Sequence, residues 1–168
     1  MQLPDAEKLY NNLVRKIQPY IGANVALIGI HTGGVWLAER LHKELGVRLP
    51  LGLLDVSFYR DDFNKIGLHP QVKPSNISFE VDNCHIILVD DVLYTGRTIR
   101  AAINELFDYG RPASIRLATL VDRGERELPI AAQYIGTSLT LPADKMLELK
   151  QHNDGTLSFN LYDKHFPE

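Results

Sequence analysis

The chain has 168 residues, of which 45% are hydrophobic and 23% are charged, and its formal net charge is -3. This composition excludes a fibrous or disordered protein, and the length predicts a single domain over residues 1–168. The negative charge argues against nucleic-acid binding through bulk charge, which depends on many Lys and Arg side chains. The single cysteine excludes an intrachain disulfide.

The sequence shows no secretory signal and no stretch that could cross a membrane, which takes about 20 apolar residues. The N-terminus lacks a basic segment followed by an apolar one, and the longest apolar runs, such as residues 25–30, are much shorter. We therefore expect a cytoplasmic protein without a membrane partner.

The first third of the chain alternates between helix and strand patterns. Apolar residues recur at spacings of three and four from Ala6 to Ile17, which predicts an amphipathic helix. The apolar run at residues 25–30 predicts a buried strand, and a second helix follows it and ends near Gly46. A further strand is predicted within residues 49–58.

The pattern fails over residues 59–83, where Gly, Pro, Asp and Asn are frequent. A loop of this length often serves as a lid or a binding loop. A strand at residues 85–90, a helix at 97–109 and a strand at 114–121 follow, so the chain as a whole predicts an α/β fold with a parallel sheet.

The C-terminal segment has a different pattern from the rest of the chain. Polar and apolar residues alternate over residues 146–150 and again over 156–162. Asp154-Gly155 stands between these two runs, and Asp-Gly is a strong signal for a tight turn. We therefore expect a C-terminal β-hairpin.

The segment from Ile86 to Thr98 carries the clearest functional signal. Apolar residues deliver Asp90 and Asp91 to the C-terminal end of a predicted strand, which is the end where open α/β sheets bind ligands. A turn with threonine hydroxyls and Gly96 then opens a helix, whose N-terminus attracts anions. The turn predicts a phosphate site, and the carboxylates predict bound sugar hydroxyls with Mg²⁺ nearby.

The aspartates and the glycines near the first strand also allow two other interpretations. The aspartates could merely cap the helix, but the whole segment is too specific for that interpretation alone. Gly29 and Gly34 have the spacing of a P-loop, but Val35 and Trp36 follow where Lys and Ser or Thr are required.

The Asp90–Thr98 segment resembles the phosphoribosyl diphosphate (PRPP) motif of type I phosphoribosyltransferases. Further similarity lies at residues 55–62, 110–114 and 121–130, so the resemblance covers about residues 25–136. The last block points to the family members that regulate pyrimidine operons and are also uracil phosphoribosyltransferases. The resemblance implies the type I phosphoribosyltransferase fold: a parallel sheet flanked by helices, with a flexible flap, a small hood and the C-terminal hairpin.

The resemblance implies a role for each matched residue. Asp90 and Asp91 would be the catalytic carboxylates and hold the ribose hydroxyls, directly or through Mg²⁺. The residues expected to bind the 5′-phosphate are Tyr94, Thr95, Gly96, Arg97 and Thr98. The residues expected to bind pyrophosphate are His31, Thr32, Gly33, Gly34 and, within a flap over residues 59–80, Arg60. Family members often carry a non-proline cis peptide bond in the first of these pyrophosphate segments.

The hood over residues 121–127 would recognise the base, and the residues assigned to it are Val121, Asp122 and Arg123. For Arg123 and Arg126 two roles stay open, because each could contact a phosphate or form ion pairs with neighbouring acids. Cys84 has no Cys or His partner at a metal-ligand spacing, so no role is assigned to it.

The resemblance implies an enzyme that converts uracil and PRPP to UMP and diphosphate with Mg²⁺, and that regulates pyrimidine biosynthesis. It would bind uridine nucleotides and form a homo-oligomer, a dimer or a tetramer. Two alternatives stay open: a weakly active or inactive transcriptional regulator that senses uridine nucleotides, and a phosphoribosyltransferase for another base. Residues 128–144 contain no Lys or Arg, so we expect only weak, non-specific RNA binding.

Overall fold

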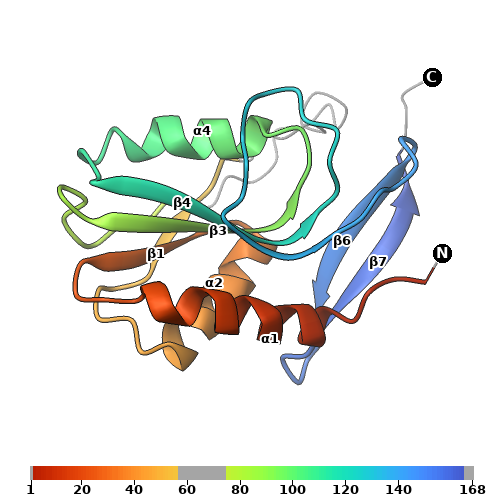
Figure 1. The fold of residues 1–168 in the computed structure, drawn as a ribbon, viewed down its shortest axis with the longest axis horizontal. Coiled ribbons are helices and arrows are strands. Elements are labelled where there is room, and N and C mark those ends of the chain that lie inside the picture. The colour runs from red at the N-terminus through yellow and green to blue at the C-terminus, as the bar shows by residue number, and fades with distance from the viewer. Residues whose placement is uncertain (1, 57–74, 165–168) are drawn as a thin grey trace.

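The computed structural model describes residues 2–56 and 75–164, and its centre is a five-stranded sheet with helices on both faces (Figure 1). The strand order is β2-β1-β3-β4-β5, and every neighbouring pair is parallel. The predicted α/β class is therefore confirmed. The strands of this sheet are β1 (Val25–Ile30), β2 (Gly52–Leu54), β3 (His85–Leu93), β4 (Ser114–Asp122) and β5 (Tyr134–Ser138).

Helices α1 (Ala6–Ile17) and α2 (Gly33–Glu44) cover one face of the sheet, and α4 (Arg97–Leu106) covers the other (Figure 1). A short 3-10 turn, Gln18–Tyr20, follows α1. The carboxylate of Asp5 accepts hydrogen bonds from the N–H groups of the first turn of α1, which stabilises that end of the helix. These helices confirm the predicted ones, although α4 ends three residues before the expected Tyr109.

The central strand β3 is buried on both faces. Its residues Ile87 and Val89 pack with α1 and α2, whereas Ile86 and Leu88 pack with α4. Because successive side chains of a strand point to opposite faces, a strand covered on both sides needs an unbroken apolar run. The run from residue 86 to residue 89 is therefore a consequence of the central position of β3.

The order of the strands creates a crevice between β1 and β3. The chain leaves β1 through α2 toward β2 on one side, and later enters β3 on the other side. Ligands of open α/β sheets bind at such a switch point, outside the carboxyl ends of the strands. Strand β3 continues past the predicted end at Asp90, because Val92 and Leu93 still pair with β4.

The C-terminal hairpin consists of β6 (Lys145–Gln151) and β7 (Leu157–Asp163), which are antiparallel. The predicted turn is confirmed, and Gly155 adopts a φ of 88° there. The hairpin stands beside the main sheet at the end toward which β3 and β4 point (Figure 1). Leu147, Leu149 and Leu157 anchor the hairpin in the core that also holds α1 and α2.

Strand β5 was not predicted from the sequence, and most of the predicted flap lies outside the described residues. Strand β5 was missed because only Tyr134 is buried among its residues, so the apolar alternation is weak. Most of the expected flap, including Arg60, lies in residues 57–74, outside the described residues. Asn76 beyond that stretch forms an isolated antiparallel bridge with Leu53.

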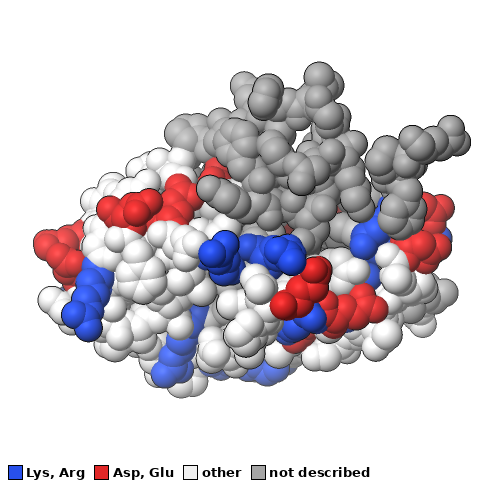
Figure 2. Space-filling view, turned by 90° about the horizontal axis from the view of Figure 1, so that it is seen from above, with Lys and Arg blue, Asp and Glu red and all other residues white. Residues whose placement is uncertain are grey.

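The surface carries both signs of charge in close proximity. From the α4 side, Figure 2 shows acidic and basic side chains next to one another rather than one continuous basic area. Some of these charges form pairs, such as Arg97 and Glu127 at 3.1 Å. No helix within residues 2–56 and 75–164 is long and apolar enough to span a membrane.

Candidate active site

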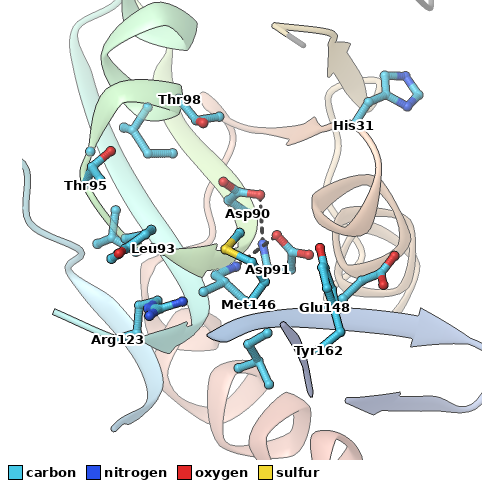
Figure 3. A pocket seen from close by; sticks show the side chains of 15 residues that line it. His31, Asp90, Asp91, Leu93, Thr95, Thr98, Arg123, Met146, Glu148 and Tyr162 are labelled. Atoms are coloured by element: carbon cyan, nitrogen blue, oxygen red, sulfur yellow. Dashed lines mark hydrogen bonds between the residues drawn. The ribbon is translucent and has the colours of Figure 1, made fainter. Parts of the chain in front are cut away.

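A cleft of about 220 Å³ opens where β3 ends, between α4 and the hairpin (Figure 3). The residues that line it come from five segments that are separated in sequence. These residues are His31, Asp90, Asp91, Val92, Leu93, Tyr94, Thr95, Gly96, Thr98, Ile99, Arg123, Met146, Leu147, Glu148 and Tyr162.

Both predicted catalytic aspartates line this cleft. Asp90 lies on the same face of β3 as Leu88, toward α4, and the neighbouring Asp91 lies toward α2. The Asp90 Oδ1 atom accepts the Asp91 N–H at 2.9 Å, and the Asp91 Oδ1 atom accepts the Val92 N–H at 2.9 Å. These backbone contacts orient the two carboxylates into the cleft, as seen in Figure 3.

Two glycines allow the start of α2 to lie against the aspartates. A Cβ atom on Gly33 would overlap the carboxylate of Asp91. A Cβ atom on Gly34 would overlap the Val89 carbonyl and lie 3.0 Å from the Cα atom of Asp90. The N-terminus of α2, a favourable place for negative charge, is thereby held beside Asp91.

The predicted pyrophosphate residues are only partly gathered at the cleft. His31 lines it, whereas Thr32, Gly33 and Gly34 form the start of α2 behind it. The peptide bond between His31 and Thr32 is cis, as the resemblance implied. Arg60 lies outside the described residues.

The predicted 5′-phosphate residues form the turn from β3 into α4. Gly96 adopts a φ of 94° and is the N-cap residue of α4, a conformation that favours glycine. The Thr95 Oγ1 atom accepts the Arg97 N–H at 3.2 Å and so satisfies a donor of the first helical turn. Tyr94, Thr95, Gly96 and Thr98 line the cleft, but the Arg97 side chain is exposed and pairs with Glu127.

The three predicted hood residues have separate environments. The Val121 side chain is fully buried in the core and does not line the cleft. The Asp122 carboxylate accepts a hydrogen bond from the Gly124 N–H at 2.9 Å and one from Arg126 Nη2 at 2.7 Å. The hydrogen bond from Arg126 is the main cause that lowers the pKa of Asp122.

Arg123 is the one hood residue whose side chain reaches the cleft, and only 2% of its surface is exposed. Its Nη1 atom donates to the Lys145 carbonyl at 2.9 Å, and its guanidinium stacks on the Tyr94 ring. Its Nε–H group is buried and has no hydrogen-bond partner among the described residues. A buried donor without a partner is costly, so this atom is suited to a polar ligand.

Sequence reasoning missed the contribution of the hairpin to the cleft. Met146 and Glu148 of β6 and Tyr162 of β7 line it, in addition to the buried Leu147 (Figure 3). Their alternating pattern indicated only a hairpin, because any two-stranded ribbon has it. The wall opposite the phosphate turn is therefore formed by the hairpin, which the predicted hood over residues 121–127 did not include.

The donor set suits a Mg²⁺ ion that arrives with its substrate. The described residues contain no group of three or more His, Cys, Asp or Glu side chains that could hold a metal by themselves. Mg²⁺ is commonly bound by one or two carboxylates together with substrate phosphates. Asp90 and Asp91 provide carboxylates of this kind.

Comparison with known proteins agrees with the geometry of this site. Residues 2–145 match the family described as "Phosphoribosyl transferase domain". The chain belongs to the phosphoribosyltransferase family. Membership confirms both the resemblance inferred from the PRPP motif and the expected fold.

Relatives with sequences similar to this chain include proteins named "Bifunctional protein PyrR". One from Pseudomonas aeruginosa is 52% identical over 153 residues, which cover 89% of this chain and 90% of the relative. Another from Nitrosococcus oceani is 61% identical over 126 residues, covering 74% of this chain and 71% of that protein. The crystal structure of a purine phosphoribosyltransferase from Pyrococcus horikoshii shares the fold, with a TM-score of 0.61 and 27% identity over 79% of this chain and 81% of that one.

Proposed function

We propose that this phosphoribosyltransferase is a uracil phosphoribosyltransferase that also regulates pyrimidine biosynthesis. The observation that carries the proposal is the meeting of two carboxylates and the N-terminus of α4 in one cleft. The first feature suits ribose hydroxyls and the second suits a phosphate. The PyrR relatives, named as bifunctional proteins, support two roles for one chain.

The substrate would lie along the cleft in three parts. The 5′-phosphate would bind at Thr95, Gly96 and Thr98, where N–H groups and hydroxyls surround the start of α4. The ribose would bind at the two aspartates, and the pyrophosphate toward His31 and the start of α2. Among the described residues of the cleft, those that remain for the base are Arg123, whose Nε–H has no partner among them, and the hairpin residues Met146, Glu148 and Tyr162.

The reaction forms a bond between a uracil nitrogen and C1′ while the bond from C1′ to the pyrophosphate oxygen breaks, and the proton of that uracil nitrogen passes to the leaving diphosphate or to solvent. Positive charge develops on the ribose in such an oxocarbenium-like transition state. The carboxylates of Asp90 and Asp91 are oriented by backbone N–H groups and would stabilise this charge without reorganising. Mg²⁺ held by these carboxylates and the diphosphate would neutralise the leaving group.

The proposal also covers the cellular location, the oligomeric state and the RNA binding of the protein. The protein would act in the cytoplasm as a single-domain subunit of a dimer or tetramer.

We propose weak, non-specific RNA binding, because acidic and basic side chains lie next to one another on the face seen in Figure 2. The test is a titration of a labelled pyrimidine-operon leader RNA, with and without UMP, at about 150 mM salt. Nanomolar binding that UMP enhances and a scrambled RNA does not show would contradict this part.

The main proposal is tested by one preparation in two assays. Turnover is measured with PRPP, Mg²⁺ and one base at a time from uracil, hypoxanthine and orotate, and UMP binding is measured by calorimetry. We expect turnover with uracil and saturable UMP binding. Turnover with a different base alone would reassign the base, and UMP binding without turnover would make the chain a nucleotide sensor.

A further inference from the structure

The segment of residues 122–130, here called the covering segment, holds the outer side of the 5′-phosphate turn. The Arg123 N–H donates to the Leu93 carbonyl at 3.0 Å. The N–H groups of Glu127 and Leu128 both donate to the Thr95 carbonyl, at 2.9 and 3.2 Å. The covering segment therefore supplies the hydrogen bonds that hold the carbonyl groups of this turn.

Arg126 is the side chain that completes this set of contacts. Its Nη1 atom donates to the Tyr94 carbonyl at 2.9 Å, and its Nε atom donates to the Ile130 carbonyl at 2.8 Å. Its Nη2 atom donates to Asp122 Oδ2 at 2.7 Å. The planar guanidinium thus joins the phosphate turn to both ends of the covering segment, a geometry that the single ammonium of lysine cannot reproduce.

The position of a carbonyl group determines where the next N–H points. All described peptide bonds of this turn are trans, and in a trans peptide the C=O and the following N–H point in opposite directions. Arg126 therefore turns the Thr95 N–H away from the covering segment, and the bonds to the Thr95 carbonyl do the same for the Gly96 N–H. Thr95 and Gly96 line the cleft, whereas Arg126, Glu127 and Leu128 of the covering segment do not.

We propose that Arg126 is a positioning residue that sets the direction in which the turn presents its N–H groups to the 5′-phosphate. Arg126 does not line the cleft, so it acts through the Tyr94 carbonyl and touches no substrate. The inference rests on the proposed function, in which this turn binds the 5′-phosphate. The sequence left two roles open for Arg126, a direct phosphate contact and an ion pair with neighbouring acids. The proposed positioning role differs from both.

The test compares the binding of UMP and uridine, which differ only in the 5′-phosphate. The dissociation constant of uridine divided by that of UMP measures what the phosphate contributes to binding. We expect R126Q to lower this ratio about tenfold, because charge-assisted hydrogen bonds that orient the turn are lost. Uridine affinity itself should stay unchanged. R126K, which keeps the charge but not the fork, should give an intermediate ratio and serves if R126Q does not fold.

Two controls separate positioning from other effects. R48Q changes an exposed arginine between α2 and β2 and should leave the ratio at the wild-type value. In R126Q/D122N both charges of the pair are absent, so recovery of the ratio would show that Arg126 acts only by neutralising Asp122, which overturns the inference. An equal loss of UMP and uridine affinity in R126Q would also overturn it.

UMP and uridine binding by the wild-type protein shows whether a negative result counts against this inference or against the proposed function. If wild-type protein binds UMP no better than uridine, the turn does not bind a 5′-phosphate and the proposed function fails. If wild-type protein prefers UMP and both R126Q and R126K keep the full ratio, the proposed function stands and the role of Arg126 is overturned.

Discussion

The guanidinium carbon of Arg123 lies 3.9 Å from the centre of the Tyr94 ring. The ammonium of Lys164 lies 4.8 Å from the same centre, and its Nζ atom donates to the Tyr94 hydroxyl at 3.2 Å. The side chain of Tyr94 therefore contacts both the residue that follows β4 and the residue that follows β7. This arrangement joins segments from two sides of the cleft.

This contact predicts different effects for two substitutions of Tyr94. Tyr94→Phe keeps the ring and its stacking on Arg123, so the free energy of unfolding should fall by less than about 1 kcal/mol. Tyr94→Ala removes the ring and should cost about 2 kcal/mol, because a desolvated cation–π contact and buried area are lost. Urea unfolding followed by circular dichroism measures both values, and equal losses would contradict the importance of the stacking.

Asp91 should matter more for turnover than Asp108, an exposed acid just beyond α4. We expect Asp91→Ala to lower kcat roughly 100-fold or more, because it removes charge stabilisation that is strongest in the transition state. Asp108→Ala should leave kcat near the wild-type value. Steady-state kinetics with PRPP and uracil measure both constants, and similar small effects would place the catalytic site elsewhere.

Gly34→Ala should destabilise the protein because the added methyl group meets backbone atoms that cannot move aside. The new Cβ atom would overlap the Val89 carbonyl. We expect the free energy of unfolding to fall by about 2 kcal/mol, typical of overpacking. Gly22→Ala is the matched control, since no atom of the described residues other than its chain neighbours lies within 4 Å of its Cβ position. Thermal denaturation should show a lower Tm for the first variant alone.

The contribution of the Asp122–Arg126 pair to the free energy of unfolding should depend on pH. The pKa of Asp122 is lowered in the folded state, so the pair contributes stability above the unfolded pKa of about 3.9 and loses it as pH falls further. The advantage of the wild-type protein over Asp122→Asn should therefore be constant above about pH 5 and shrink at lower pH. Urea unfolding at several pH values measures this difference, and a constant difference down to pH 2 would contradict the shift.

Removal of divalent ions should abolish phosphoribosyl transfer. Asp90 and Asp91 line the cleft, and Mg²⁺ is commonly bound by one or two carboxylates together with substrate phosphates, so we expect the diphosphate to share in binding the ion. We expect no turnover with excess chelator and metal-free PRPP, and recovery on addition of Mg²⁺. The unfolding temperature without substrate should not respond to the chelator. Full activity without divalent ions would count against the proposed mechanism.

Local patterns in the sequence predicted most elements of the fold. The apolar run at residues 86–89 has to be a buried strand, because such a run is stable only where both faces are covered. The glycine and threonines after it form a turn with few alternative conformations, so Gly96 and Thr95 lie at the start of α4 as expected. The Asp154-Gly155 turn was equally clear, because few sequences adopt its backbone angles.

Strand β5 and the wall of the cleft were not predictable in this way. Strand β5 is an edge strand whose residues are mostly half-exposed, so its pattern depends on neighbours rather than on its own sequence. Met146 and Tyr162 reach the cleft only because Leu147, Leu149 and Leu157 pack the hairpin into the core beside α1. That packing joins residues far apart in sequence, and no local pattern encodes it.

The sequence by itself determined where the candidate site lies, because adjacent aspartates and a glycine-containing turn at a strand end can be recognised from a short segment. Tertiary structure decided which side chains take part. It buried Val121 in the core, paired Asp122 with Arg126, and left the buried Nε–H group of Arg123 without a hydrogen-bond partner within the described part of the chain. The physical reason is that hydrogen-bond partners and burial depend on contacts between distant segments, whereas turn geometry depends on neighbours along the chain.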